Sequence, residues 1–307
     1  MLTPLDRTID DAGYHYSHVK AEVDKQGRTA TITVEAPTEN IADNIEDIHS
    51  AAANWWPLLM ARELDDAILL LRTNNEEIGT ILLKTKGDHK KVLAADAILS
   101  KHQSDWFVRE VIGMMRRTFA RLDVSSRSLF ALVEENSCFA GCLYELALSA
   151  DRIYMLDIGQ EEGEPTNIAL SEMNFGDLEM VNGRTRLANR FYDDEGVLGI
   201  LKQQVGVDID AADAEVKGLV TFIPDDIDWE EEIRLLVEER ASLSPDALTG
   251  MEANLRFGGA ENSATKIFGR LSAWQNWIFN RPNAVGEKGA LKLFGSGTKA
   301  EFDRRRV

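Results

Sequence analysis

Helical and strand-like patterns alternate from residue 61 to residue 157, and this alternation constrains the fold more than any other feature of the sequence. Apolar side chains recur with helical spacing over 61–74 and 104–124. Short apolar runs typical of buried strands occupy 78–85, 128–134 and 152–157. Strands that alternate with helices favour a parallel sheet, so the sequence predicts an α/β fold. In such folds, sites form where a strand ends and the next helix begins.

The two ends of the chain differ from this central region. Residues 14–23 and 28–36 alternate in polarity around a short polar turn, which predicts a hairpin. Beyond the apolar run 218–223 no further strand is expected, and the pattern becomes helical. The sequence therefore predicts a core over 1–225 and a helical C-terminal appendage over 226–307. Trp274, Trp277 and Phe279 in the appendage suit either core packing or a subunit interface.

Composition excludes several classes of function. The formal net charge of -18 opposes loose binding to nucleic acid or to an anionic membrane surface. No apolar run approaches the length of about 20 residues that a membrane span requires, and the N-terminus lacks the pattern of a secretory signal, so we expect a cytoplasmic protein. Cys138 and Cys142 are the two cysteines, too few for a disulfide framework, and with no nearby histidine they predict no metal site.

A single acid, Glu145, lies within the helical and mostly apolar segment 137–152. A carboxylate in that setting is costly unless it is paired, solvated or used in catalysis. Gly141 stands at the predicted strand-to-helix turn just before it. Backbone N–H groups at the start of a helix are unpaired and favour anions, so this turn can hold a developing oxyanion. A second N–H group is expected from 89–99, interpreted as a loop at the same sheet edge.

At this point the sequence resembles the crotonase, or enoyl-CoA hydratase/isomerase, superfamily. The stretch CFAGCLYELALSAD is similar to the segment of that superfamily with the first catalytic glutamate, and KVLAADAIL to its first oxyanion segment. ALSEMNFGDLEMVNGRTRLANRF is similar to the segment with the second glutamate, and IDAADAEVKGLVTFI to the closing helix and strand. The resemblance covers about residues 14–225 in the same order, and it implies a crotonase-like spiral core with a helical C-terminal appendage.

The resemblance also implies site residues. Glu145 matches the first glutamate and Glu172 the second, and the two would act as base and acid in turn. Backbone amides near Ala94 or Ala95, and at Gly141 and Cys142, match the pair that stabilises an enolate of a CoA thioester. The substrate would be an acyl-CoA, and no cofactor or metal ion is implied.

More narrowly, the chain resembles the C-terminal half of a tandem crotonase-like lyase of aerobic benzoate breakdown. The stretches WWPLLMARELDDAILLLRTN, WFVREVIGMMRRTFARLDVSSRSL and FNRPNAVGEKGALKLFGSGTKAEFDRRRV carry this likeness. It implies carbon–carbon cleavage that opens the ring of a benzoyl-CoA dihydrodiol with water, giving a dehydroadipyl-CoA semialdehyde and formate. The partners implied are the N-terminal crotonase-like half and further copies in a homo-oligomer.

Alternatives remain open because the turn before Glu145 is poor in glycine, with Leu143 and Tyr144 after Cys142. Glu145 would then be a structural acid paired with Arg184 or Arg186, and Glu172 a surface acid. The corresponding function is a non-catalytic assembly domain that lacks a competent oxyanion hole. A free-standing hydratase or isomerase is a third reading.

Overall fold

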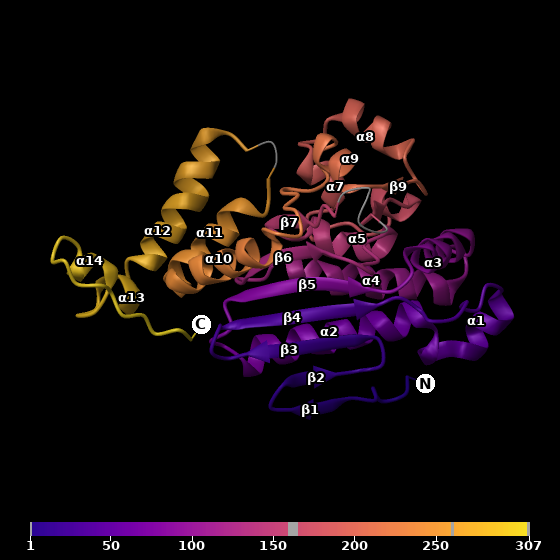
Figure 1. The fold of residues 1–307 in the computed structure, drawn as a ribbon, viewed down its shortest axis with the longest axis horizontal. Helices are drawn as coiled ribbons and strands as arrows, with labels where there is room; N and C mark the ends of the chain where they lie inside the picture. The colour runs from indigo at the N-terminus through magenta and orange to yellow at the C-terminus, as the bar shows by residue number, and fades with distance from the viewer. Residues whose placement is uncertain (1, 159–164, 259–260, 306–307) are drawn as a thin grey trace.

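A seven-stranded mixed sheet forms the centre of the protein (Figure 1). The structure, a computed structural model, describes residues 2–158, 165–258 and 261–305. The strands lie side by side in chain order, antiparallel from β1 to β4 and parallel from β4 to β7. Their bounds are β1 Thr8–Asp10, β2 Gly13–His15, β3 Val19–Asp24, β4 Thr29–Glu35, β5 Thr80–Lys86, β6 Ser128–Val133 and β7 Arg152–Met155. A second, two-stranded sheet pairs β8 (Ile168–Ala169) with β9 (Asp208–Ile209).

The helices of the core connect and cover the parallel strands, as the alternating sequence pattern predicts. They are α1 Ile45–Ala51, α2 Trp56–Asn74, α3 His89–Lys101, α4 Trp106–Asp123, α5 Gly141–Leu148, α7 Arg186–Arg190, α8 Glu195–Lys202 and α9 Ala211–Val216. Short 3-10 turns occupy Ala52–Asn54 (η1) and Glu172–Phe175 (η2). The α/β fold class predicted from the sequence is confirmed.

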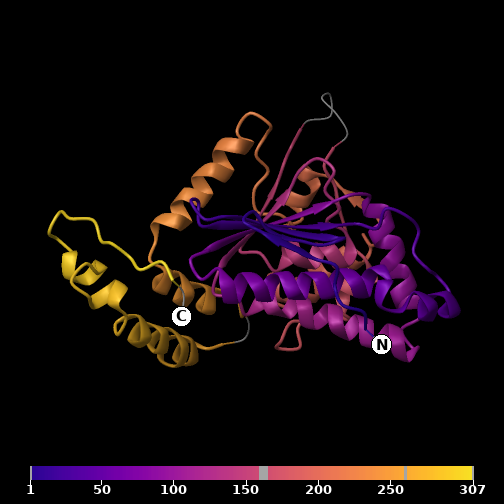
Figure 2. The same ribbon diagram turned by 90° about the horizontal axis from the view of Figure 1, so that it is seen from below.

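The two faces of the sheet carry different layers (Figure 2). Helices α2 and α4 run along one face, and the large hydrophobic core fills the space between them and the strands. On the other face a small second cluster joins Phe130 and Leu132 of β6 to Leu236 of α10 (Trp229–Ser242). Strand β6, all of whose residues are buried, is therefore covered on both sides, whereas β4 and β5 keep half-buried side chains on the face of the second cluster.

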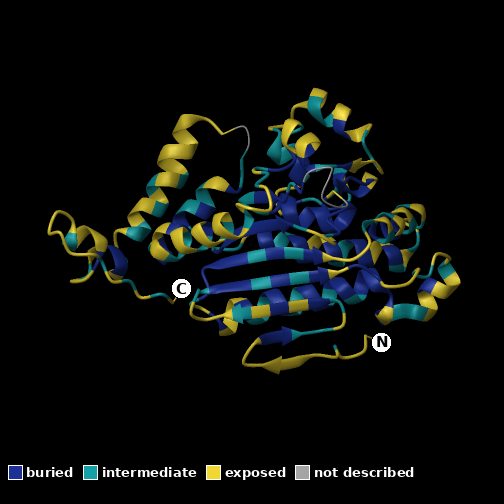
Figure 3. Cartoon of the chain, in the orientation of Figure 1, coloured by how far each residue is buried: buried dark blue, intermediate teal, exposed yellow. Residues whose placement is uncertain are grey.

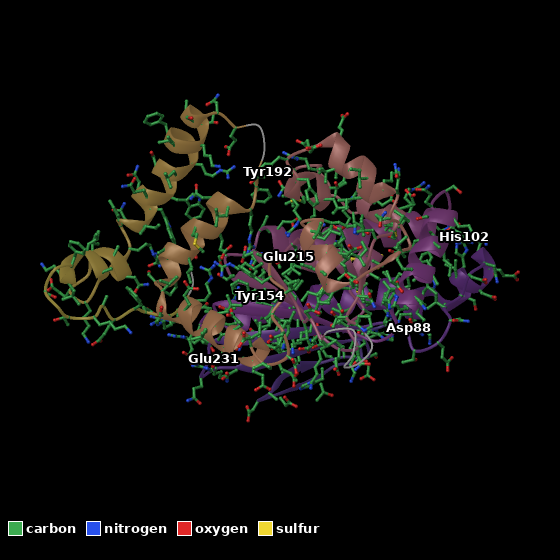
Figure 4. All side chains as sticks on the ribbon, turned by 45° about the horizontal axis from the view of Figure 1, so that its top comes forward. Asp88, His102, Tyr154, Tyr192, Glu215 and Glu231 are labelled. Carbon is green, nitrogen blue, oxygen red and sulfur yellow. The ribbon has the colours of Figure 1, made fainter. Side chains whose placement is uncertain are left out.

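Two local predictions are wrong. The strand predicted over 14–23 is two strands, because the chain turns where the Tyr16 N–H donates to the Val19 carbonyl at 2.9 Å. The loop predicted over 89–99 is the helix α3, which begins where the Asp88 side chain accepts from the Lys90 N–H. Figure 4 labels Asp88 and His102 at the two ends of this helix. The strand expected over 218–223 is reduced to one isolated bridge to β7, between Phe222 and Tyr154.

Helix α11 (Pro245–Leu255) is fastened to the core by a buried polar cluster, which we call the Arg256 clasp. Arg256 donates to the backbone carbonyls of Leu122, Ser125 and Arg127 at 2.7, 2.6 and 2.5 Å. Ser128, the first residue of β6, donates its hydroxyl to Glu252 at 2.6 Å. The clasp therefore ties the start of the predicted appendage to the turn between α4 and β6.

The chain beyond the clasp extends away from the core (Figure 1). It contains the π-helix η3 (Thr265–Leu271), α12 (Ser272–Ile278), α13 (Pro282–Val285) and α14 (Ala290–Leu293). Many of its side chains are exposed (Figure 3). Trp274 and Trp277 are half-buried and pack edge to face with ring centroids 5.5 Å apart, whereas Phe279 is exposed. The division at residue 225 stays a prediction.

Within the described residues, no helix combines the length and the apolar character that crossing a bilayer needs.

Candidate active site

The predicted turn before Glu145 lies at the carboxyl end of β6, where the chain crosses into α5. Gly141 begins the helix with φ +46°, a left-handed conformation that favours glycine. The residue before it, Ala140, forms a bridge to Ala169, the last residue of β8. All eight residues of α5 are buried (Figure 3). Glu145 is consequently an acid inside the protein, as the sequence indicated.

Glu145 is the centre of a buried ion network, the Glu145 cluster, formed with Asp123, Asn174 and Arg186. The Arg186 guanidinium donates to Glu145 Oε2 at 2.8 Å. It also donates two hydrogen bonds to the Asp123 carboxylate, at 2.8 and 3.1 Å. Asn174 donates to the other oxygen of Glu145 at 2.6 Å. Both ion pairs involve side chains that are 1% exposed, so these charges are almost fully withdrawn from water.

Two carboxylates and one guanidinium leave the Glu145 cluster with one excess negative charge when all are ionised. Burial raises the pKa of Glu145, and the neighbouring Arg186 and the Asn174 hydrogen bond oppose this rise. Burial also raises the pKa of Asp123, again opposed by Arg186. The pKa of both acids is therefore set by burial, which raises it, and by Arg186, which lowers it.

A second buried acid, Asp96 of α3, lies at the start of α5. Its Oδ2 accepts from the Cys142 N–H at 2.7 Å and from the Ser171 hydroxyl at 2.6 Å. A Cβ atom on Gly141 would stand 1.9 Å from the same oxygen, so no residue larger than glycine fits there without displacing Asp96. Burial raises the pKa of Asp96 to about 6, although these hydrogen bonds oppose the rise. We call Asp96, Gly141, Cys142 and Ser171 the Asp96 cluster.

Glu172 lies on η2, and its side chain points to solvent, whereas Glu145 is buried. Ser171 and Asn174, the neighbours of Glu172, point inward and bind Asp96, Gly141 and Glu145. The side chain of Glu172 is 59% exposed and lies 3.5 Å from Lys202. The structure thus places the backbone of the two predicted segments together, while the two carboxylates have different environments.

The predicted oxyanion amides of Ala94, Ala95 and Cys142 are engaged within the protein. Ala94 and Ala95 lie inside α3, beyond its first turn, where amides donate to carbonyls four residues earlier. The Cys142 amide donates to Asp96. The carbonyl of Gly141 accepts from Asn174 at 2.9 Å. The catalytic roles of the two glutamates and the oxyanion role of these amides stay predictions. The anion that the Cys142 amide binds in this structure is the side chain of Asp96.

A cavity of about 290 Å³ borders the Glu145 cluster on the side of α7 and α11. Asp123 and Arg186 line it together with Asp151, Arg190 and Arg256. Leu148, Met180 and Leu255 also line it, so the cavity wall combines charged and apolar side chains. Among the described residues, no group of three or more histidine, cysteine or acidic side chains is arranged to hold a metal ion.

Solved structures of enoyl-CoA hydratases have a similar fold. An enoyl-CoA hydratase of Geobacillus kaustophilus superposes with a TM-score of 0.66 at 18% identity, covering 94% of this chain and 98% of that one. An enoyl-CoA hydratase of Bacillus anthracis gives a TM-score of 0.62 at 18% identity, covering 94% and 100%. The protein has the crotonase fold. At this level of identity the likeness concerns the fold alone.

The sequence itself is similar to a characterised type of lyase. Benzoyl-CoA-dihydrodiol lyase of Aromatoleum evansii is 58% identical over 306 residues, which is 100% of this chain and 55% of that protein. The likeness to such a lyase that the sequence predicted is confirmed. The chain spans about half the length of this relative. No family model matches the chain.

Proposed function

We propose that this chain forms half of a ring-cleaving lyase of the crotonase type, acting on a CoA thioester. The observation that carries the proposal is the 58% identity to benzoyl-CoA-dihydrodiol lyase, sustained along the entire chain. The reaction would open the ring of the benzoyl-CoA dihydrodiol with water, giving a dehydroadipyl-CoA semialdehyde and formate. The crotonase fold of the chain supports a thioester substrate, because the enoyl-CoA hydratases named above share it.

The partner in this proposal is the other half of the same enzyme. Since the chain covers 55% of its relative, the remainder has no counterpart here. By resemblance the missing part is the N-terminal, crotonase-like half, and the location is cytoplasmic. Exposed apolar side chains on the C-terminal helices, including Phe268 at 76% and Phe294 at 90%, support contact with that half or with further copies. No cofactor is proposed.

Glu145 and Glu172 are the acids proposed to take part in proton transfer, in alternating roles of base and acid. Burial raises the pKa of Glu145 above its ordinary value, which is the direction expected of a carboxyl group that acts as a general acid. Its two bonds to Asn174 and Arg186 fix its orientation. Glu172 is accessible from solvent and would approach the substrate from outside α5.

A second candidate is an assembly half that supports catalysis elsewhere in the enzyme. The observation that favours it is the hydrogen bond from the Cys142 amide to Asp96, which occupies the predicted oxyanion donor. In this case Glu145 is a structural acid, and its partner is Arg186, one of the two arginines considered from the sequence.

The deciding experiment measures formate release from the benzoyl-CoA dihydrodiol. The chain is assayed alone and together with the remainder of the relative, produced as a separate polypeptide. Formate from the combined halves supports the proposal, and its absence from two folded, associated halves contradicts it. Glu172→Gln in this chain then separates the two candidates, since loss of formate indicates catalysis in this half and unchanged release indicates assembly.

A further inference from the structure

The start of α5 is a physical site for an anion. Helix N-termini present unpaired N–H groups and the positive end of the helix dipole. The residue in the capping position, Ala140, has no side chain that can accept these bonds. Gly141 adds room beside the Cys142 amide because it carries no Cβ. The local sequence therefore leaves this N-terminus without a cap of its own.

We propose that Asp96 is a built-in occupant of this anion site, and that it keeps a thioester oxygen from binding at the Cys142 amide in this half of the enzyme. The carboxylate comes from a position 46 residues earlier in the chain. It lies at 2.7 Å from the Cys142 nitrogen, a normal distance for a charge-assisted bond. This is the contact that an oxyanion would otherwise make with the helix.

The surroundings of Asp96 make it hard to displace. Asp96 is 1% exposed, and it sits on the buried face of α3 beside Val92, Ala95 and Leu99. The Ser171 hydroxyl donates to the same oxygen that binds the Cys142 amide. Since the carboxylate is attached to the protein, it competes with any ligand at a high effective concentration. A thioester oxygen, which is neutral before reaction, is a weaker acceptor than this carboxylate.

The second carboxylate oxygen of Asp96 indicates that this side chain does more than cap the helix. Its Oδ1 is buried and has no hydrogen-bond partner among the described residues, which is an expensive arrangement for a carboxylate oxygen. A side chain selected only to cap α5 needs one oxygen and would be cheaper as asparagine or serine. The geometry therefore points to a site whose volume is filled by the protein. The inference rests on the second candidate of the proposed function, the assembly half, and takes from the first only the identity of the excluded ligand as a thioester.

The test follows the Cys142 amide directly. Because the chain has two cysteines, selective ¹⁵N-cysteine labelling yields two amide signals. The Cys138 amide, which donates to the Thr85 hydroxyl at 2.9 Å, serves as an internal control, and Cys138→Ser assigns the pair. We titrate the wild-type chain with benzoyl-CoA and expect the Cys142 signal to stay in place. A saturable shift of Cys142 without one of Cys138 would overturn the proposal.

The second arm opens the site. Asp96→Ala removes the carboxylate, and sodium acetate is the probe that replaces it. We expect acetate to shift the Cys142 signal saturably in Asp96→Ala, and to leave it unshifted in the wild type and in Asp96→Asn, whose amide oxygen still fills the position. Asp177→Ala is the matched control. It removes another acid, whose charge raises the pKa of Asp96, and it should behave as wild type.

The inference would be refuted if the Asp96→Ala variant folds and its Cys142 amide signal does not shift when acetate is added. If that variant does not fold, the wild-type titration with benzoyl-CoA decides the question alone. Neither arm depends on turnover, so a failure of the formate assay and a failure of this inference are distinguishable.

Discussion

Replacing Arg186 by methionine is the sharpest test of the Glu145 cluster. The substitution keeps an unbranched side chain of similar length but removes the bonds at 2.8 Å to Glu145 and at 2.8 and 3.1 Å to Asp123. Glu145 is then buried without a counter-charge, and Asp123 keeps only its weaker charge interaction with Arg256. Breaking a buried ion pair from one side costs about 3–5 kcal/mol. At roughly 2–4 °C per kcal/mol for a chain of this size, we expect Tm to fall by about 6–20 °C.

The loss in Arg186→Met should depend on pH with a definite sign. Without Arg186, the pKa values of Glu145 and Asp123 rise further above their ordinary values, because burial then loses the strongest of the interactions that oppose it. A raised folded-state pKa means that the folded protein gains stability when the acids are protonated, and loses it as pH rises. The fall in Tm should therefore be smaller at pH 5 than at pH 8.

Calorimetric melts of wild type and Arg186→Met at pH 5, 6.5 and 8 measure both quantities. Arg184→Met is the matched control, because Arg184 is partly exposed and pairs with the exposed Asp193, so its loss should cost about 1 kcal/mol or less. A loss below about 1 kcal/mol for Arg186→Met at pH 8, or an equal loss at pH 5 and pH 8, would refute the reasoning.

Three further outcomes are expected from single sites. Glu172→Gln should leave the free energy of unfolding within about 0.5 kcal/mol of wild type, because the side chain is exposed, and a larger change in a thermal melt would contradict that exposure. Gly141→Ala should destabilise by more than about 2 kcal/mol, since its φ of +46° is left-handed and its Cβ would collide with Asp96. In urea melts the double variant Gly141→Ala, Asp96→Ala should lose less than the two single losses together, whereas simple additivity would contradict the contact. Burial, then the nearby Asp151, raises the pKa of Glu252 to about 8, so stability should fall as pH rises from about 4.5 towards 8. Glu252→Gln should flatten that part of the pH profile, and an unchanged slope would assign the dependence to other groups.

The fold follows from the sequence where local pattern and tertiary need agree. The alternation over 61–157 predicted the parallel strands and their helices, because a doubly covered strand must be continuously apolar. Residues 89–99 show how an analogy can override such a pattern. Val92, Ala95, Asp96 and Leu99 are spaced as one helical face and are buried, yet the segment was interpreted as a loop that supplies an N–H group at the sheet edge.

The site was predictable only in part. The apolar setting of Glu145 indicated a buried, partnered acid, and Arg186 was one of two arginines considered for it. The sequence offers no rule for choosing between Arg184 and Arg186, because the choice depends on which of them the turn before α7 directs inward. Asp96 carries no local signal of its role, since its partners Cys142 and Ser171 lie 46 and 75 residues away in the chain. Asp123 was missed for the same reason, because it meets Glu145 only through Arg186.

The Arg256 clasp sets where this protein can be shortened. A chain cut at residue 225 would leave three backbone carbonyls at the turn between α4 and β6 without their donor, and would uncover Phe130 and Leu132, on which α10 packs. A chain that stops after Phe257 would keep both contacts, although it would lose the bonds from Arg281 and Asn283 to the buried Asp246. We expect the longer truncation product to be recovered as a cooperatively melting protein and the shorter one to aggregate, so the excisable unit begins about thirty residues later than the change in sequence pattern suggests.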